Sequence, residues 1–442
     1  MANVLPQQFK IFNNELRVEY SPDTKRTRAE MEAILKNALG NSFEIIEFVK
    51  GQRVVTGVIT GAEGRKTYIM AANLTFMGGK EGQHPKDLKR IQYNNNWKIF
   101  YDKYSCDGDV MWFGLYSYND MNIWAYFKPE SYLKKHMGKE MVSVGGHKAQ
   151  YSCHIFLNDL YQGYMNGYFQ KVDKNNNIVG AIKSDYLKEF FSSIEREEKN
   201  PIIAAIQKLN KEKIRWNEWI TAKEAITYMK ELKEKTGFGM WKQNLWNGWL
   251  IEAYYSEFFH DNFSDYIDYI ATSKNTSVVS EYGKMGLDLA FPHCKYHFIG
   301  DLKAVCEGGG NTLLNDETKV IEALNKYHRI WFVMYIHDKK QGKTNDYEMV
   351  KWRNHFIKDM GEWDSKKPFS ELSARNTPHS ISYSEMVIIE LNEITKEKYF
   401  SINKQFGVNS DGKQRNLKFT VNKKLLDTSD DSFVIYRYRP HI

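Results

Sequence analysis

The sequence predicts an α+β protein with two domains, residues 1–195 and 196–442, and three patterns support this prediction. Before residue 195, strand-like runs such as RVVTGVITG (53–61) and TYIMAANLTFM (67–77) mix with polar turns and a helical pattern at RAEMEAILKNAL (28–39). A charged segment with Pro201 follows, and residues 192–216 are interpreted as a helical connection. After it, helices and strands follow each other in an order typical of a mixed sheet flanked by helices.

The second domain is expected to begin with two helices and to continue with strands around a third helix. The first two helices are TAKEAITYMKELKEKTG (221–237), which Gly237 ends, and NLWNGWLIEAYYSEFFHD (244–261). Strands are expected at GLDLAF (286–291), HFIGDLKAV (297–305) and RIWFVMYIHD (329–338), with the third helix at NDETKVIEALNKYH (315–328). Three more strands are expected at 384–391, 416–421 and 432–439. The sequence leaves open whether these last strands extend the sheet or build a separate lobe.

Composition and charge favour a soluble globular protein with an anionic partner. Apolar residues make up 42% of the chain and charged residues 26%, and the formal net charge is +7. No leader-like segment opens the sequence, and the longest strongly apolar run, residues 330–336, is too short to cross a bilayer. The four cysteines form no CxxC pair, which favours reduced thiols. We therefore expect a cytoplasmic protein without a membrane partner.

Two of the expected strands carry charges in apolar surroundings. Asp288 and Asp301 each lie in a short apolar run, and Lys303 follows Asp301 by two residues. Residues i and i+2 of a strand project from the same face, so we expect Asp301 and Lys303 on one side of the sheet. Glu252 lies among large apolar residues of the second helix, and Gly248 one turn earlier is expected to let this helix approach the sheet closely. Buried charges of this kind cost roughly several kcal/mol unless they are paired or bind a metal.

Residues 244–338, which contain these charges, resemble the core of the PD-(D/E)XK nuclease superfamily, and of type II restriction endonucleases in particular. That core has a helix glutamate, a hairpin with Asp followed by Asp/Glu-x-Lys, and a crossover helix. Here Leu287, rather than proline, precedes Asp288. The resemblance implies that the C-terminal domain is a restriction-endonuclease-like core, with the N-terminal α+β domain left for DNA recognition.

The resemblance also implies a role for each residue. Asp288 and Asp301 would bind Mg²⁺ together with the backbone carbonyl of Leu302, and Glu252 would hold a metal-bound water or a second ion. Lys303 would orient the attacking water and offset negative charge. These residue types suit the chemistry, because Mg²⁺ prefers oxygen ligands and phosphodiester hydrolysis requires an activated water and stabilised phosphate charge. The alternative is an exposed ion pair between Asp301 and Lys303 on an edge strand.

Two polar, basic runs are candidates for DNA contacts. The run HPKDLKRIQYNNNWK (84–98) combines side chains suited to phosphates with side chains suited to base edges. The expected phosphate contacts are Lys86, Lys89 and Arg90, and the expected base contacts are Gln92, Asn94, Asn95 and Asn96. A second run, 403–418, has the same character, and a solvated loop is the alternative interpretation of both.

From these observations we expect a Mg²⁺-dependent, site-specific deoxyribonuclease that acts on double-stranded DNA. The resemblance implies a homodimer. Two alternatives stay open: a modification-dependent or repair nuclease with the same core, and a DNA-binding protein of nuclease fold that does not cleave.

Overall fold

A computed structural model describes most of the chain, and the following account concerns the described residues. These are residues 4–12, 15–48, 53–78, 81–134, 151–173, 175–192, 200–243, 245–262, 266–292, 297–308, 310–340, 343–366, 368–371, 378–404, 414–427 and 432–440. The chain forms two compact units. Unit 1 comprises Met1–Glu198, Glu393–Thr395 and Ser429–Phe433, and unit 2 comprises Lys199–Asn392, Lys396–Thr428 and Val434–Ile442. The expected α+β class is confirmed.

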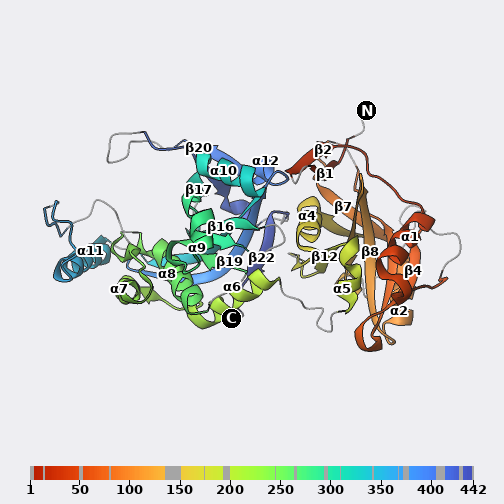
Figure 1. Ribbon diagram of the computed structural model, residues 1–442, viewed down its shortest axis with the longest axis horizontal. Helices are drawn as coiled ribbons and strands as arrows, with labels where there is room; N and C mark the ends of the chain where they lie inside the picture. The colour runs from red at the N-terminus through yellow and green to blue at the C-terminus, as the bar shows by residue number, and fades with distance from the viewer. Residues whose placement is uncertain are drawn as a thin grey trace. The chain divides into compact units, whose positions relative to one another are not determined.

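Unit 1 is built on a seven-stranded mixed sheet of order β11-β12-β9-β8-β5-β4-β3. Only β5 and β8 in this sheet pair in parallel. Two smaller sheets complete the unit, one of order β10-β7-β6 and one in which β1 pairs with β2, and Figure 1 labels the strands of the second. Its strands are β1 (Gln7–Phe12), β2 (Glu15–Tyr20), β3 (Phe43–Ile45), β4 (Val55–Thr60), β5 (Lys66–Asn73), β6 (Thr75–Phe76), β7 (Leu88–Tyr93), β8 (Asp109–Tyr118), β9 (Met121–Phe127), β10 (Tyr151–Phe156), β11 (Tyr168–Val172) and β12 (Ile178–Lys183). Its helices are α1 (Arg28–Leu39), α2 (Asn95–Tyr104), α3 (Pro129–Lys134), α4 (Leu157–Asn166) and α5 (Leu187–Ser192).

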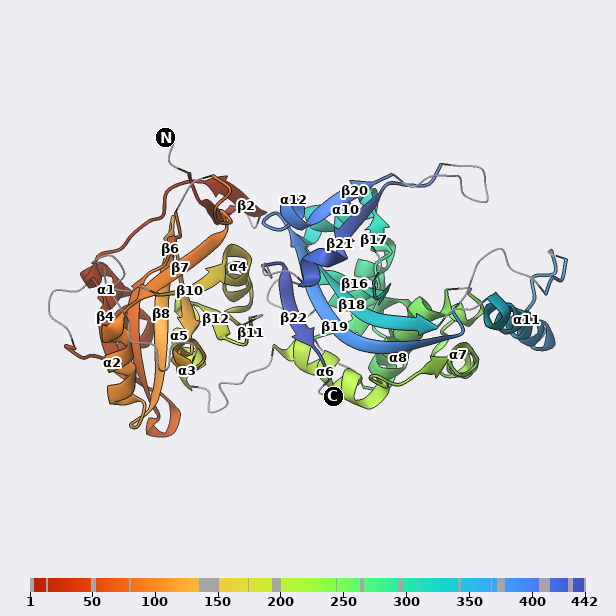
Figure 2. The same cartoon turned by 180° about the vertical axis from the view of Figure 1, so that it is seen from behind.

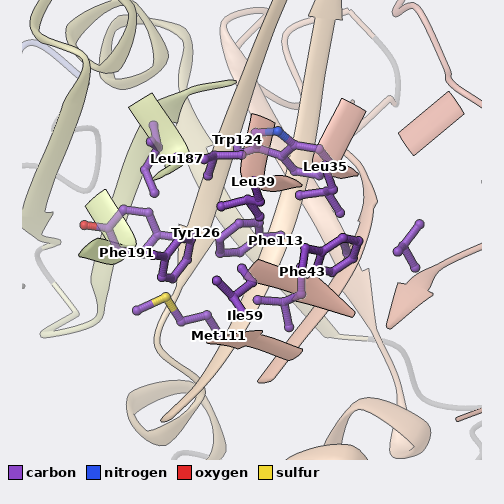
Figure 3. Packing of buried hydrophobic residues seen from close by; sticks show 14 of the residues in the cluster. Leu35, Leu39, Phe43, Ile59, Met111, Phe113, Trp124, Tyr126, Leu187 and Phe191 are labelled. Atoms are coloured by element: carbon purple, nitrogen blue, oxygen red, sulfur yellow. The ribbon is translucent and has the colours of Figure 1, made fainter. Parts of the chain in front are cut away.

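One hydrophobic core of unit 1 lies between its large sheet and the helices α1 and α5. Leu35 and Leu39 of α1 and Phe191 of α5 pack with Phe113 and Trp124 of the central strands (Figure 3). Helix α1 begins where its sequence predicts, because Thr27 and Glu30 form a capping box whose side chains satisfy backbone amides of the first turn. The predicted helix at 28–39 is thereby confirmed.

Unit 2 contains a second seven-stranded mixed sheet, of order β13-β19-β18-β16-β15-β14 with β22 paired to β19. Strand β16 is antiparallel to β15 and parallel to β18, and the chain passes from β16 to β18 through β17 and helix α10. The long strands β18 and β19 run side by side (Figure 2). The strands of this sheet are β13 (Ile220–Thr221), β14 (Asp268–Tyr269), β15 (Leu289–Phe291), β16 (Phe298–Cys306), β18 (Arg329–Lys340), β19 (Ser380–Asn392) and β22 (Val434–Tyr438).

The last three predicted strands divide between two sheets. Strands β19 and β22 extend the large sheet, whereas β21 lies in a separate sheet of order β17-β21-β20. The strands of this small sheet are β17 (Asn311–Asp316), β20 (Phe400–Asn403) and β21 (Lys418–Asn422). The sequence does not predict β17, because its first residues follow a glycine run that is typical of a loop.

Three helices of unit 2 agree closely with the predicted helices at 221–237, 244–261 and 315–328, whereas others have no predicted counterpart. They are α6 (Pro201–Lys213), α7 (Ala222–Thr236), α8 (Trp246–Asp261), α9 (Thr276–Tyr282), α10 (Glu317–Tyr327), α11 (Lys343–Asp359) and α12 (Lys396–Tyr399). Helix α7 ends at Gly237, whose φ of 81° is left-handed. The expected role of Gly248 in α8 is wrong, because a Cβ at that position would meet no atom within 4 Å. No helix in the described part of the chain has the length and hydropathy that crossing a membrane requires.

Candidate active site

Asp288 lies directly before β15, and two hydrogen bonds hold it against strand β16. The backbone N–H of Asp288 donates to the carbonyl of Gly300 at 3.1 Å, and its Oδ2 accepts from the N–H of Leu302 at 3.0 Å. In a strand the N–H and C=O of one residue point to the same side, so the carbonyl of Leu302 also faces Asp288. The structure thus brings Asp288 to the backbone of Leu302.

Asp301 and Lys303 project from the same face of β16, as their spacing predicts. The two side chains form an ion pair, with 2% of the Asp301 side chain and 22% of the Lys303 side chain exposed. Strand β16 lies between β15 and β18, so it is not an edge strand. The alternative interpretation, an exposed ion pair on a sheet edge, is therefore wrong.

Helix α8 brings Glu252 to the same group of charges. The hydroxyl of Tyr269, on β14, donates to Oε2 of Glu252 at 2.7 Å. Burial raises the pKa of Glu252 to about 7, and the charge of Asp301 adds to this effect. The sequence does not predict this role of Tyr269, because the residues around it do not distinguish it from a core tyrosine.

The charges of the cluster influence one another strongly. Burial and the neighbouring carboxylates of Asp301 and Glu252 raise the pKa of Asp288 well above its ordinary value. Burial opposes the charge of Lys303, but the carboxylates of Asp301 and Asp288 outweigh burial and raise the pKa of the lysine. Three carboxylates therefore face one ammonium group, and full ionisation would leave two negative charges without a partner.

This donor set fits Mg²⁺. Within the described ranges, no three His, Cys, Asp or Glu side chains are arranged to hold a metal ion by themselves. Mg²⁺ does not require three such ligands, because it binds through one or two carboxylates and completes its shell with water and phosphate oxygens. Asp288, Asp301 and the carbonyl of Leu302 are the groups that would hold it, and the excess negative charge matches a divalent cation.

Lys89 is too deeply buried to contact a DNA phosphate. Its side chain is fully buried, and its Nζ lies 2.6 Å from Oδ1 of Asp23 and 3.1 Å from Oε1 of Gln8. The alternation of β7 explains this, because Lys89, Ile91 and Tyr93 all face the buried side of the sheet. We therefore correct the expectation: Lys89 belongs to an internal ion pair of unit 1.

The other cationic candidates of this run are partly engaged within unit 1. The guanidinium of Arg90 donates to Oγ of Ser152 at 3.1 Å and to the carbonyl of Met77 at 3.2 Å, and burial lowers the pKa of Arg90. Lys86 is more exposed, with its Nζ 3.7 Å from Oε1 of Glu81. Of the three expected phosphate contacts, Lys86 thus has the most accessible charge.

The polar candidates lie at the end of β7 and the start of α2. Asn94 caps α2, and its side-chain oxygen accepts from the N–H of Asn96 at 3.0 Å, which gives it a local structural role. Gln92 and Asn95 are exposed and Asn96 is half-buried. In the second run, residues 405–413 lie outside the described residues, and Lys418 forms an ion pair with Asp316.

Comparison with known proteins concerns unit 1 rather than the acidic cluster. Residues 65–191 match the family model described as methylase-associated X1 (MTaX1). This domain is found in restriction–modification systems. The match covers under a third of the chain and includes the polar run at 84–98. No PD-(D/E)XK nuclease family model matches, and neither does any curated protein or solved structure.

Proposed function

We propose that this protein is a Mg²⁺-dependent, site-specific DNA endonuclease of a restriction system. The observation that carries the proposal is the cluster of Asp288, Asp301, Lys303 and Glu252, which comes from the β15–β16 region and from helix α8. Three carboxylates crowded together, with Asp301 buried and Asp288 and Glu252 half-buried, would contribute little to a protein that needed only stability. Perturbed pKa values of this kind concentrate at functional sites.

Each side chain has a role that its surroundings support. Asp288 and Asp301 would hold the metal together with the Leu302 carbonyl, and Glu252 would hold a water at the same site. Lys303 orients the attacking water and offsets the charge that grows on the phosphate during in-line displacement. When bound, Mg²⁺ supplies Lewis-acid stabilisation of the phosphate oxygens and lowers the pKa of water.

The methylase-associated segment supports a role in restriction and a partner that is double-stranded DNA. Unit 1 contains this segment, so we assign DNA recognition to unit 1 and cleavage to unit 2. The resemblance to type II restriction enzymes also supports a homodimer, which would cut both strands of a palindromic site.

The same segment favours a second candidate, a nuclease that depends on DNA modification. A domain associated with methylases is compatible with an enzyme that cannot cleave methylated DNA. It is equally compatible with an enzyme that cleaves only methylated DNA. The two candidates share the cluster in unit 2 and differ in what unit 1 reads.

Digestion of methylated and unmethylated genomic DNA tests both candidates. With Mg²⁺ we expect discrete fragments from one of the two substrates, and no fragments in EDTA or with Asp301→Asn, which keeps the side-chain shape but removes its charge. Cleavage of only the unmethylated DNA identifies a restriction enzyme of the ordinary kind, and cleavage of only the methylated DNA identifies the second candidate. DNA binding without any metal-dependent fragments would contradict both and leave a non-cleaving DNA-binding protein.

A further inference from the structure

The side chain of Asn315 contacts the candidate active site from outside the hairpin. Its Nδ2 donates to Oδ1 of Asp301 at 3.1 Å and makes a longer contact, 3.5 Å, with the carbonyl of Gly286. An amide oxygen in this place would meet a carboxylate oxygen, so the nitrogen must face Asp301. Asn315 therefore links Asp301 to the segment that leads into Asp288.

An irregularity in the small sheet directs Asn315 toward β16. Strand β17 pairs regularly with β21 as far as Leu313, and the register then shifts before Asp316. Asp316 is fixed on both sides, because its Oδ1 lies 2.7 Å from Nζ of Lys418 and its Oδ2 accepts from Asn416 at 2.9 Å. Strand irregularities of this kind re-aim a side chain and are frequent beside active sites.

The contact from Asn315 completes the support of Asp301. Lys303 pairs with Oδ2 of Asp301 and Asn315 donates to Oδ1, so both oxygens are held and the carboxylate cannot rotate freely. Each carboxylate oxygen has two acceptor sites, so this support leaves room for a metal ion. Partners that orient a ligating carboxylate typically contribute about 10–100-fold to metal affinity or activity.

We propose that Asn315 is a positioning residue that orients Asp301 for binding a divalent metal ion, and that the small sheet β17-β21-β20 is the support of this residue. This inference rests on the proposed function, because the metal ion belongs to that proposal. It adds a residue outside 288–303 and gives the small sheet a role in the site.

Calorimetric titration of the full chain with Mn²⁺, without DNA, tests the inference. Asn315→Ala is expected to weaken Mn²⁺ binding by roughly 10-fold or more. At saturating Mg²⁺ the variant should recover much of the cleavage rate, because the ligands themselves remain, whereas Asp301→Ala should not recover. Asn416→Ala is the matched control, since it removes an amide-to-carboxylate hydrogen bond from the same strand at Asp316, and its metal affinity should equal that of the wild type. Asn315→Leu, with a similar volume and no donor, serves if the alanine variant does not fold.

The outcomes separate this inference from the proposed function. If Asp301→Ala abolishes Mn²⁺ binding while Asn315→Ala and Asn315→Leu bind like the wild type, the positioning role is wrong and the metal site stands. Equal weakening by Asn416→Ala would also overturn it, because the effect would then come from general loosening of β17. If the wild type and Asp301→Ala bind Mn²⁺ equally, both the metal site and the role of Asn315 fail.

Discussion

At the scale of single residues, crowded carboxylates cost stability in the absence of metal. The pKa of Glu252 rises from an ordinary 4.5 to about 7 on folding, so the folded state binds more protons than the unfolded state between these values. The contribution of this residue to stability is therefore present at low pH and is lost as pH rises through about 7. In EDTA at pH 8, Glu252→Gln should raise the free energy of unfolding of unit 2 by about 1–3 kcal/mol. Chemical denaturation across pH 5–8 measures this.

Glu257, on the same helix, provides a control, because its pKa is lowered rather than raised by folding. Burial opposes its charge, but hydrogen bonds from Lys213 and Tyr228 outweigh burial and lower its pKa. Its contribution is present above its ordinary pKa and is lost as pH falls. Glu257→Gln should therefore destabilise unit 2 at pH 8. A Glu252→Gln variant that loses stability in the same way would contradict the repulsion assigned to the cluster.

Lys89 is a second residue whose effect on stability can be predicted. Removing one member of a buried ion pair leaves the other charge without a partner, which costs about 3–5 kcal/mol. We expect Lys89→Met to destabilise unit 1 by about this amount because Asp23 and Gln8 lose their shared donor. Denaturation followed by tryptophan fluorescence checks this. Lys86→Met, on an exposed side chain of the same segment, should change stability little. If the Lys89→Met protein is as stable as the wild type but binds DNA more weakly, Lys89 contacts a DNA phosphate after all.

At the scale of elements, the close packing of the hairpin depends on Gly300. A Cβ there would lie 2.8 Å from Cε2 of Phe291 and 2.9 Å from the carbonyl of Trp331. Gly300→Ala should therefore lower the stability of unit 2 by about 1–3 kcal/mol. Gly248→Ala is the matched control, because a Cβ in α8 meets nothing within 4 Å and should stabilise by up to about 1 kcal/mol. Thermal melts of the two variants that shift in the same direction would contradict this packing.

The elements also show how far the sequence predicts this protein. Helix α7 is predictable from its helical period, its capping box at Thr221 and its end at Gly237, and α10 from its helical period. Helix α8 and strands β16 and β18 are predictable as long apolar runs. Strands β13 and β14 are not, because each has two residues and pairing rather than pattern defines it. Asp301 and Lys303 are predictable together from their spacing, whereas the contacts of Tyr269 and Asn315 depend on tertiary structure. The burial of Lys89 is predictable from its place on the same face of β7 as Ile91 and Tyr93. The basic composition of this run instead indicates an exposed segment.

At the scale of the whole molecule, binding to DNA predicts a dependence on salt. In Ca²⁺, which we expect to support binding with little cleavage, the affinity of the full chain for its site should fall steeply as salt rises. The log–log slope should be about 0.9 per phosphate contacted. Fluorescence anisotropy between low and moderate salt measures this slope. A flat response would remove DNA as the main partner and leave the acidic cluster without a substrate.

Single-turnover cleavage in Mg²⁺ tests whether one cluster both binds the metal and activates the attacking water. Lys303→Ala leaves all three carboxylates in place, so specific binding in Ca²⁺ should persist while the cleavage rate falls by at least about 10²-fold. Asp301→Ala should lose cleavage and also weaken binding in Ca²⁺. Lys230→Ala, which removes the ion pair with Glu234 on α7, is the control and should cleave at the wild-type rate. If the Lys303→Ala protein cleaves at the wild-type rate, Lys303 does not activate water and the ion pair on β16 is structural.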